Sequence, residues 1–132
     1  YGTFPHRRLM LLRSALAELE IAPEARVAWM TVPSEEYDRL GATSDDLEGL
    51  VDYPRSVEGV EVGLLFRRTT RGGTKISFRS NGDVDVNELA RRFGGGGHVR
   101  ASGALVEGSL EDVRNEVVTA TIAAVEILDV NR

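Results

Sequence analysis

Residues 93–104 read Phe-Gly-Gly-Gly-Gly-His-Val-Arg-Ala-Ser-Gly-Ala. Four consecutive glycines are entropically costly to order, so they are useful only where the backbone needs unusual angles or must approach another group closely. Polyglycine is also typical of flexible linkers. A linker is a poor explanation here, because the run joins two well-patterned segments and is followed by His98 and Arg100 instead of serine. The sequence therefore predicts an ordered loop.

The chemistry of this loop suits an anionic ligand. Successive backbone N–H groups in a glycine-rich turn can form a concave anion-binding nest. His98 can donate a hydrogen bond or stack on a base, and the planar guanidinium of Arg100 can grip a phosphate with two hydrogen bonds. We expect His98 to contact a ligand; the alternative is that it only caps a turn.

The segments around the loop carry clear secondary-structure signals. Asp85 and Glu88 form a capping-box-like start for a helix, and Gly94 suits its left-handed end. Further upstream, Arg71-Gly72-Gly73 joins two apolar runs in the manner of a β-hairpin. The expected elements in chain order are a helix over 6–20, a strand over 26–32, helices over 34–39 and 44–51, strands over 60–69 and 74–80, a helix over 86–93, a strand over 101–107 and a helix over 110–128.

This order predicts an α/β fold in which helices pack on a mixed sheet of about four or five strands. A length of 132 residues fits a single domain. In the first helix, leucines recur at helical spacing and should form an apolar stripe. These leucines are Leu9, Leu12, Leu16 and Leu19.

The strand over 74–80 places chemically different side chains on its two faces. Successive side chains of a strand point to opposite sides of the sheet. Ile76 and Phe78 therefore share an apolar face, while Lys75, Ser77 and Arg79 share the other. Two cations and a hydroxyl are thus expected side by side. Arg67 and Arg68 alternate in the preceding strand, so at most one of them can join that face.

Composition narrows the possible functions. The chain has no cysteine, which excludes disulfides, a thiol nucleophile and cysteine-ligated metals, and its two histidines are too few for a histidine cluster. The net charge is −5, yet residues 67–100 carry eight basic and three acidic side chains, a local charge of +5. A basic segment within an acidic chain favours a small anionic ligand over long duplex DNA. No apolar run is long enough to span a membrane.

The motif residues resemble a known family. The runs Phe78-Arg79-Ser80, Asp85-Val86-Asn87 and Phe93 to Ala104 are similar to the DHH-associated domain, type 1. This domain stands at the C-terminus of RecJ-like phosphoesterases, and the resemblance is closest to bacterial oligoribonucleases that also hydrolyse 3′-phosphoadenosine 5′-phosphate (PAP). It covers about residues 26–128. Ser102 stands where the family usually has alanine, a small change.

The resemblance implies a substrate-binding role for seven residues. Four match the family loop, two match its strand site, and Arg100 is added from its charge and position. The first six are Gly95, Gly96, Gly97, His98, Arg79 and Ser80. The chain has no Asp-His-His motif, so we expect no catalytic residue and no metal or cofactor in it. Manganese is expected in an N-terminal DHH domain, to which residues 1–20 would be the linker helix, with 21–132 as the substrate-binding domain.

The expected partners are short oligonucleotides, PAP or dinucleotides, and the DHH domain of the same parent chain, with homodimer formation left open. We expect a cytoplasmic location and no association with membranes. Three other functions remain open: an RNA-binding module like that at the C-terminus of alanyl-tRNA synthetases, a cyclic-dinucleotide phosphodiesterase domain, and a dimerisation domain with a purely structural glycine loop. The acidic net charge disfavours a large RNA partner.

Overall fold

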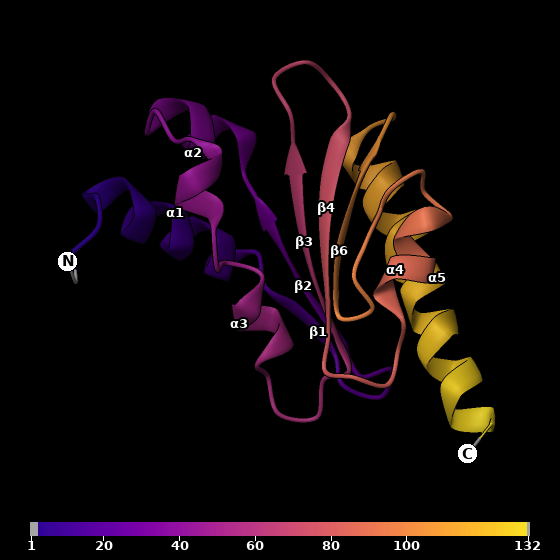
Figure 1. The fold of residues 1–132 in the computed structure, drawn as a ribbon. Helices are drawn as coiled ribbons and strands as arrows, with labels where there is room; N and C mark the ends of the chain where they lie inside the picture. Colours follow the sequence, from indigo (N-terminus) through magenta and orange to yellow (C-terminus); the bar gives the residue numbers. More distant parts are fainter. Residues whose placement is uncertain (1–2, 132) are drawn as a thin grey trace.

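The computed structural model describes residues 3–131, which form a six-stranded mixed sheet with helices on both faces (Figure 1). The sheet order is β1-β2-β3-β4-β6-β5. The elements are α1 (His6–Ala17), β1 (Glu20–Ala22), β2 (Val27–Val32), α2 (Ser34–Arg39), a 3-10 helix η1 (Ser44–Leu47), α3 (Asp52–Arg55), β3 (Val62–Arg68), β4 (Thr74–Ser80), α4 (Val86–Arg91), β5 (Gly96–Gly97), β6 (Ala101–Val106) and α5 (Leu110–Val130). The predicted α/β class is confirmed, with six strands in place of four or five.

Hydrogen bonding defines the sheet around its central hairpin. β2 and β3 run parallel, whereas every other neighbouring pair is antiparallel. β3 and β4 form the hairpin that the Arg71-Gly72-Gly73 turn predicts, with Leu64 opposite Phe78. A parallel pair needs a long crossover, and the chain provides it with α2, η1 and α3 between β2 and β3.

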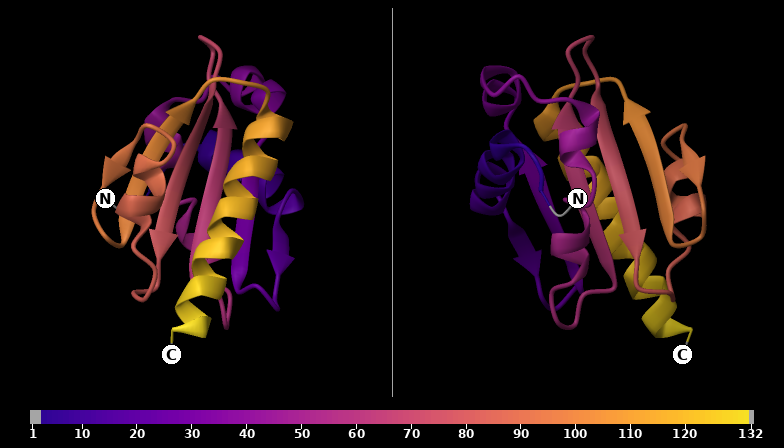
Figure 2. Two further views of the ribbon diagram at one scale, coloured as in Figure 1. Left: turned by 90° about the vertical axis from the view of Figure 1, so that its right-hand side faces the viewer. Right: turned by 60° about the vertical axis from the view of Figure 1, so that its left-hand side comes forward.

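Each face of the sheet has its own apolar core. On one face, α4 and α5 pack on the sheet, and the buried residues include Leu64, Phe66, Ile76, Phe78, Val86, Leu89, Val113 and Val117. On the other face, α1, η1 and α3 pack on the β2 side, and the buried residues include Leu11, Ala15, Met30, Val32, Leu50, Val51 and Leu65. Figure 2 shows that the second group of helices leaves β4 and β6 uncovered. No helix within residues 3–131 combines the length and apolarity needed to cross a membrane.

Several local features differ from the sequence expectations. β1 and β5 are only three and two residues long, and β5 is built of glycine, which is depleted in strands. A short helix forms at Asp52–Arg55, where no element was expected, and the helix expected over 44–51 is a 3-10 turn. In α1, Leu11 and Ala15 face the core while Leu9 and Leu16 of the predicted stripe are exposed. Leu12 and Leu19 do pack against this core, so the predicted stripe is confirmed for two of its four leucines.

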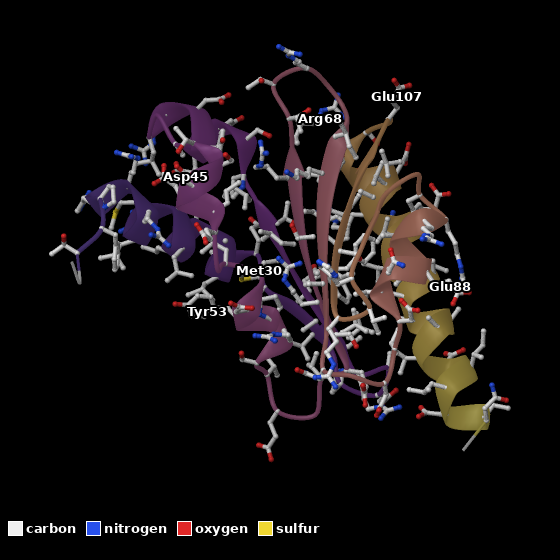
Figure 3. The ribbon with its side chains drawn as sticks, viewed as in Figure 1. Met30, Asp45, Tyr53, Arg68, Glu88 and Glu107 are labelled. Atoms are coloured by element: carbon white, nitrogen blue, oxygen red, sulfur yellow. The ribbon has the colours of Figure 1, made fainter. Side chains whose placement is uncertain are left out.

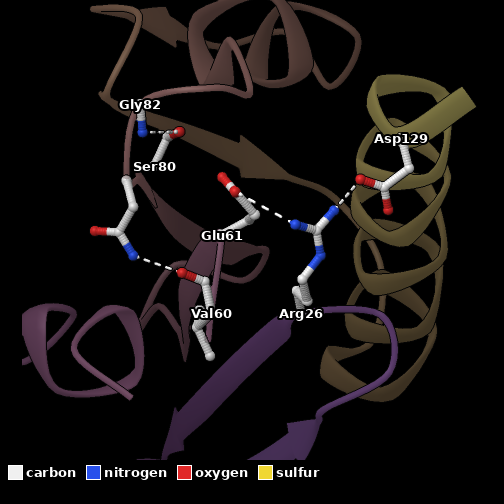
Figure 4. Close-up of polar contacts among 7 residues, drawn as sticks. Arg26, Val60, Glu61, Ser80, Gly82 and Asp129 are labelled. Atoms are coloured by element: carbon white, nitrogen blue, oxygen red, sulfur yellow. Dashed lines mark hydrogen bonds and ion pairs between the residues drawn. The ribbon is translucent and has the colours of Figure 1, made fainter. Parts of the chain in front are cut away.

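Arg26 joins three distant segments (Figure 4). It precedes β2 with a left-handed φ of 59°, which is uncommon for a residue with a side chain. Its carbonyl oxygen accepts a hydrogen bond from the Glu61 N–H at 2.8 Å. Its guanidinium lies 3.6 Å from the Glu61 carboxylate and also forms an ion pair with Asp129 near the end of α5. The start of β2, the start of β3 and the last turn of α5 are thus held together.

Two glycines allow backbones to pack where a side chain could not fit. A Cβ on Gly63 would lie 2.5 Å from the Arg55 nitrogen, so α3 can cross β3 only because residue 63 is glycine. A Cβ on Gly95 would lie 2.0 Å from the carbonyl oxygen of Gly103 in β6. Both contacts are with backbone, which cannot move aside cheaply. Within the glycine run, Gly95 therefore allows the end of α4 to pack closely on β6.

Replacing Gly95 by alanine should lower the free energy of unfolding by about 3 kcal/mol or more, because the new methyl group collides with β6. The matched control is Gly96→Ala, where the nearest atom to a Cβ is the Asn87 side-chain oxygen at 3.4 Å, an ordinary contact. We expect the control to cost less than about 1 kcal/mol. Urea unfolding of both variants measures the difference, and equal stabilities would contradict this account of the loop.

Asp46 ties α1 to the second core. Its nearly buried carboxylate accepts hydrogen bonds from the Thr43 backbone N–H at 2.9 Å and from the Arg7 guanidinium at 2.7 Å. The Thr43 bond and, next, the Arg7 bond hold the pKa of Asp46 below its ordinary value. Because the folded pKa is the lower one, the stabilisation is complete above the unfolded value of about 4 and is lost as pH falls through the folded value.

Asp46→Ala should lower the free energy of unfolding by about 1–2 kcal/mol at pH 7, since it removes the cap of η1 and the partner of Arg7. The gap between wild type and variant should shrink at pH 3, below the unfolded pKa of about 4, because the unfolded chain then binds a proton more readily than the folded chain does. Urea titrations at the two pH values measure it. Asp45→Ala, an exposed neighbour in the same turn, serves as control. A gap that is as large at pH 3 as at pH 7 would contradict the assignment.

Candidate functional site

The open face of the sheet is built from cross-strand rows. In the row nearest the β3–β4 turn, Lys75 lies opposite Arg67 on one side and Leu105 on the other. Two residues along, Ser77 lies between Leu65 and Gly103, and two further on, Arg79 lies between Gly63 and Ala101. Directly paired residues share a face, so the predicted grouping of Lys75, Ser77 and Arg79 is confirmed.

Arg67, and not Arg68, joins these cations. Arg68 belongs to the opposite face of β3, and its guanidinium donates to the carbonyl oxygen of Gly108 ahead of α5. Figure 3 shows Arg68 at the turn end of the sheet near Glu107, with Met30 and Tyr53 on the side of the N-terminal helices. The alternation expected from the sequence therefore separates a structural arginine from one on the open face.

A groove runs along β4 between the sheet and the η1–α3 segment. It encloses about 260 Å³. We call it the strand groove; it is lined by Ser44, Leu47, Glu48, Val51, Leu65, Arg67, Lys75, Ser77 and Arg79. Ser77, in the middle row of its lining, has a small side chain, and the cross-strand neighbour Gly103 has none. A ligand can therefore approach the backbone of the sheet there.

A second hollow lies beside the β3–β4 turn and encloses about 590 Å³. We call it the hairpin hollow; it is lined by Tyr37, Arg67, Thr69, Thr70, Arg71, Gly72, Lys75, Gly95, Gly103, Ala104 and Leu105. Arg67 and Lys75 line both spaces. The strand groove and the hairpin hollow are thus neighbours that share a cationic wall.

The cations of this surface are not neutralised by the protein. The ion pairs within residues 3–131 use Arg7, Arg26, Arg39 and Arg55. They leave Arg67, Arg71, Lys75 and Arg79 without a carboxylate partner in that range. Glu48 is the one carboxylate that lines either space. The surface is therefore electropositive although the chain as a whole is acidic.

Neighbouring groups hold the two arginines of the strand groove in place. The Arg79 guanidinium donates to the Phe78 carbonyl oxygen at 2.9 Å and lies 3.5 Å from that of Ser102. The Arg67 guanidinium carbon lies 4.9 Å from the centre of the Tyr37 ring, in a cation–π contact. A guanidinium has five N–H donors, so both arginines retain donors for a ligand.

The glycine run does not form the predicted nest of free N–H groups. Gly95 donates to the Ala90 carbonyl oxygen at 2.9 Å, and Gly97 donates to the Asn87 side-chain oxygen at 2.9 Å. His98 donates through its backbone to the Ala101 carbonyl oxygen at 2.7 Å. These N–H groups are used to end α4 and to build the β5–β6 turn, so they are not available to an anion.

The seven expected site residues separate into two groups. Arg79 lines the strand groove and Gly95 lines the hairpin hollow. His98 is exposed in the β5–β6 turn, whose far end, Ala101, pairs with Arg79; within residues 3–131 no group hydrogen-bonds its ring. Gly96 and Gly97 form the edge strand beside it.

Ser80 and Arg100 lie away from the strand groove. Ser80 is buried on the opposite face from Arg79, and its hydroxyl accepts the Gly82 N–H at 3.0 Å (Figure 4). The Arg100 guanidinium lies over Gly82, where a Cβ would be 3.2 Å from it. Both shape the turn after β4. The family resemblance implied that Ser80 contacts the ligand together with Arg79, but adjacent strand residues face opposite ways, so the Ser80 side chain lies on the other face.

Three residues of the open surface were not predicted from the sequence as site residues: Tyr37, Arg71 and Leu105. Tyr37 comes from α2, Arg71 from the β3–β4 turn and Leu105 from β6. For Leu105 the signal was available, since an apolar residue two positions beyond Gly103 alternates onto the same face. For Tyr37 no local signal exists, because only the packing of α2 brings it to the sheet.

Comparisons with known proteins agree with this architecture. A model of the DHHA1 domain matches residues 25–126. The bifunctional oligoribonuclease and PAP phosphatase NrnA of Thermus thermophilus is 41% identical over 86 residues, which are 58% of this chain and 25% of that protein. The probable bifunctional oligoribonuclease and PAP phosphatase NrnA of Streptococcus mutans is 28% identical over 102 residues, 77% of this chain and 32% of that protein.

Proteins of known structure also share this fold. An exopolyphosphatase-related protein from Bacteroides fragilis has a TM-score of 0.89 at 30% identity, over 98% of this chain and 38% of that chain. A Vibrio pGpG-specific phosphodiesterase shares the fold, with a TM-score of 0.59 at 13% identity, over 92% of this chain and 39% of that chain. This chain spans between 25% and 39% of the length of these four proteins. It belongs to the DHHA1 domain family, in the form carried by NrnA-like DHH phosphoesterases.

Proposed function

We propose that this domain binds the nucleotide substrate of a DHH-family phosphoesterase, and that the strand groove is where it does so. The observation that carries the proposal is the group of cations Arg67, Lys75 and Arg79 on one open sheet face, with no carboxylate paired to them within residues 3–131. A phosphate can therefore bind there without breaking an existing ion pair. The substrates we propose are short oligonucleotides and PAP, the class for which the NrnA relatives are named.

Each side chain has a distinct proposed role. Arg79 can donate two parallel hydrogen bonds to a phosphate, a geometry that a guanidinium fixes better than an ammonium. Lys75 is exposed and adds a mobile point charge two rows away, nearer the β3–β4 turn. Ser77 offers a hydroxyl between them. His98, exposed in the turn at the Arg79 end of the sheet, is proposed to stack on a base or donate to the substrate.

The hydrolytic chemistry is assigned to another part of the parent protein. No three His, Asp or Glu side chains within residues 3–131 come together in a way that could hold a metal ion. Two-metal hydrolysis requires such a cluster. We therefore propose that an N-terminal DHH domain holds manganese, that residues 1–20 connect to it, and that the domain from residue 21 onward orients the nucleotide. The larger size of the relatives supports this division.

Binding should be measurable by NMR titration of this chain with the 5′-phosphorylated diadenylate pApA. We expect saturable amide shifts at Lys75 to Arg79 and around His98. Arg79→Ala should weaken binding about 10-fold or more, since a charge-assisted hydrogen bond contributes roughly 1.5–3 kcal/mol. His98→Ala should also weaken binding. Arg91→Ala, an exposed arginine of α4 behind the sheet, is the matched control and should change affinity less than twofold.

Two results would contradict the proposal. One is the absence of saturable shifts with pApA and PAP at millimolar concentration. The other is an equal loss of affinity in Arg79→Ala and Arg91→Ala, which would indicate a non-specific effect of charge. Long single-stranded RNA provides a further comparison, because an RNA-binding module should prefer it strongly over pApA.

A further inference from the structure

The proposed phosphate site in the strand groove does not account for the hairpin hollow. It is the larger of the two spaces, at about 590 Å³ against about 260 Å³. Its wall combines an aromatic ring, a leucine and glycine backbone, provided by Tyr37, Leu105, Gly95 and Gly103. The same lining carries Arg67, Arg71 and Lys75, so the hollow joins apolar and aromatic surface, which suits a ring-containing ligand, to positive charge.

Leu105 is unusual for the face on which it stands. Its side chain is 61% exposed; it lies near the end of β6, directly opposite Lys75. It lies beside the turn, where Gly73 leaves room for it, and its outer face is open to solvent. It is placed to pack against the flat face of a base that enters beside the β3–β4 turn.

Arg67 forms the opposite wall and is already held flat. One face of its guanidinium covers the Tyr37 ring at 4.9 Å. A guanidinium plane that is stacked on one side can stack on a base with the other, as arginine does in single-stranded nucleic acid sites. Arg67 and Leu105 lie in the same row with Lys75 between them, so their backbones are about 10 Å apart. Lys75 can lie along the floor on its methylene stem while its ammonium reaches outward.

The shared wall determines how the two spaces combine. Arg67 and Lys75 line both, so a group bound at this wall can extend into the strand groove on one side and into the hairpin hollow on the other. A phosphate that joins two nucleosides is such a group. A ligand with one nucleoside can occupy one space only.

From these observations we infer that the hairpin hollow is the subsite for a second nucleoside, in which a base stacks between Arg67 and Leu105, so that the domain selects ligands of two or more nucleotides over mononucleotides. This inference rests on the proposed function, because it takes the strand groove as the first subsite. Tyr37 acts through Arg67 and is a positioning residue.

The test compares the affinities of this chain for pApA, AMP and PAP by calorimetry or NMR. We expect pApA to bind about 10-fold or more tightly than AMP, since stacking of one base contributes roughly that factor. Leu105→Ser should remove most of this advantage and leave the affinities for AMP and PAP within twofold. Amide shifts at Thr70, Arg71 and Leu105 should appear with pApA and be absent with AMP.

Two further variants keep the test independent of folding. Tyr37→Leu retains an apolar contact but frees Arg67, which lines both spaces, so it should reduce the pApA affinity more than the AMP affinity. Arg71→Ala changes an exposed turn residue and should act in the same direction. Ile127→Ser is the matched control, an exposed apolar residue of α5 on the far face. It should leave all three affinities unchanged.

The outcomes separate this inference from the proposed function. Equal affinities for pApA and AMP, together with no effect of Leu105→Ser, would overturn the second subsite while the strand groove survives. An equal loss of pApA and AMP affinity in Leu105→Ser would also overturn it, because the hollow would then hold the first nucleoside. If none of the three ligands binds, the proposed function itself fails.

Discussion

The hydrogen-bonded register of β3, β4 and β6 is the constraint on which the candidate site depends. Opposite Lys75 stand Arg67 and Leu105, and opposite Arg79 stand Gly63 and Ala101. A slip of one residue between β3 and β4 would move every side chain to the other face. Ile76 and Phe78 would then meet solvent, and the cations would enter the core beneath α5. Burial of the apolar core therefore fixes the register, and the register fixes the positions of the cations on the opposite face.

The glycines support this register instead of binding an anion themselves. Gly95 brings the end of α4 against β6, and Gly97 lets the edge strand turn back with a φ of 155°. Their N–H groups have acceptors in the protein. What the loop presents to solvent is the His98 side chain in a fixed turn. A glycine-rich motif can thus be essential for binding by positioning its neighbours, without supplying donors of its own.

Local patterns predicted most of the fold. The Asp85 cap and the Gly94 end located α4, the Arg71-Gly72-Gly73 turn located the hairpin, and the alternation of Lys75, Ser77 and Arg79 located the open face. β5 escaped prediction because its two glycines pair with β6 only when α4 has positioned them. The site was less predictable for the same reason. Tyr37, Arg67 and Leu105 are far apart in sequence, and no local pattern links them. Ser80, which the family resemblance implied at the site, is buried on the opposite face.

The unequal lengths of the strand connections bear on the order in which the molecule assembles. β3 and β4 are joined by a five-residue turn at Thr69–Gly73, whereas β2 must be separated from its parallel neighbour β3 by α2, η1 and α3. Short loops close quickly and long parallel crossovers close slowly. The chain loses conformational entropy when a loop closes, and this loss comes before the strands at its ends can pair. The hairpin can therefore nucleate the sheet. The cationic face would then be set early in folding, and the docking of β2 with its covering helices would be the slow step.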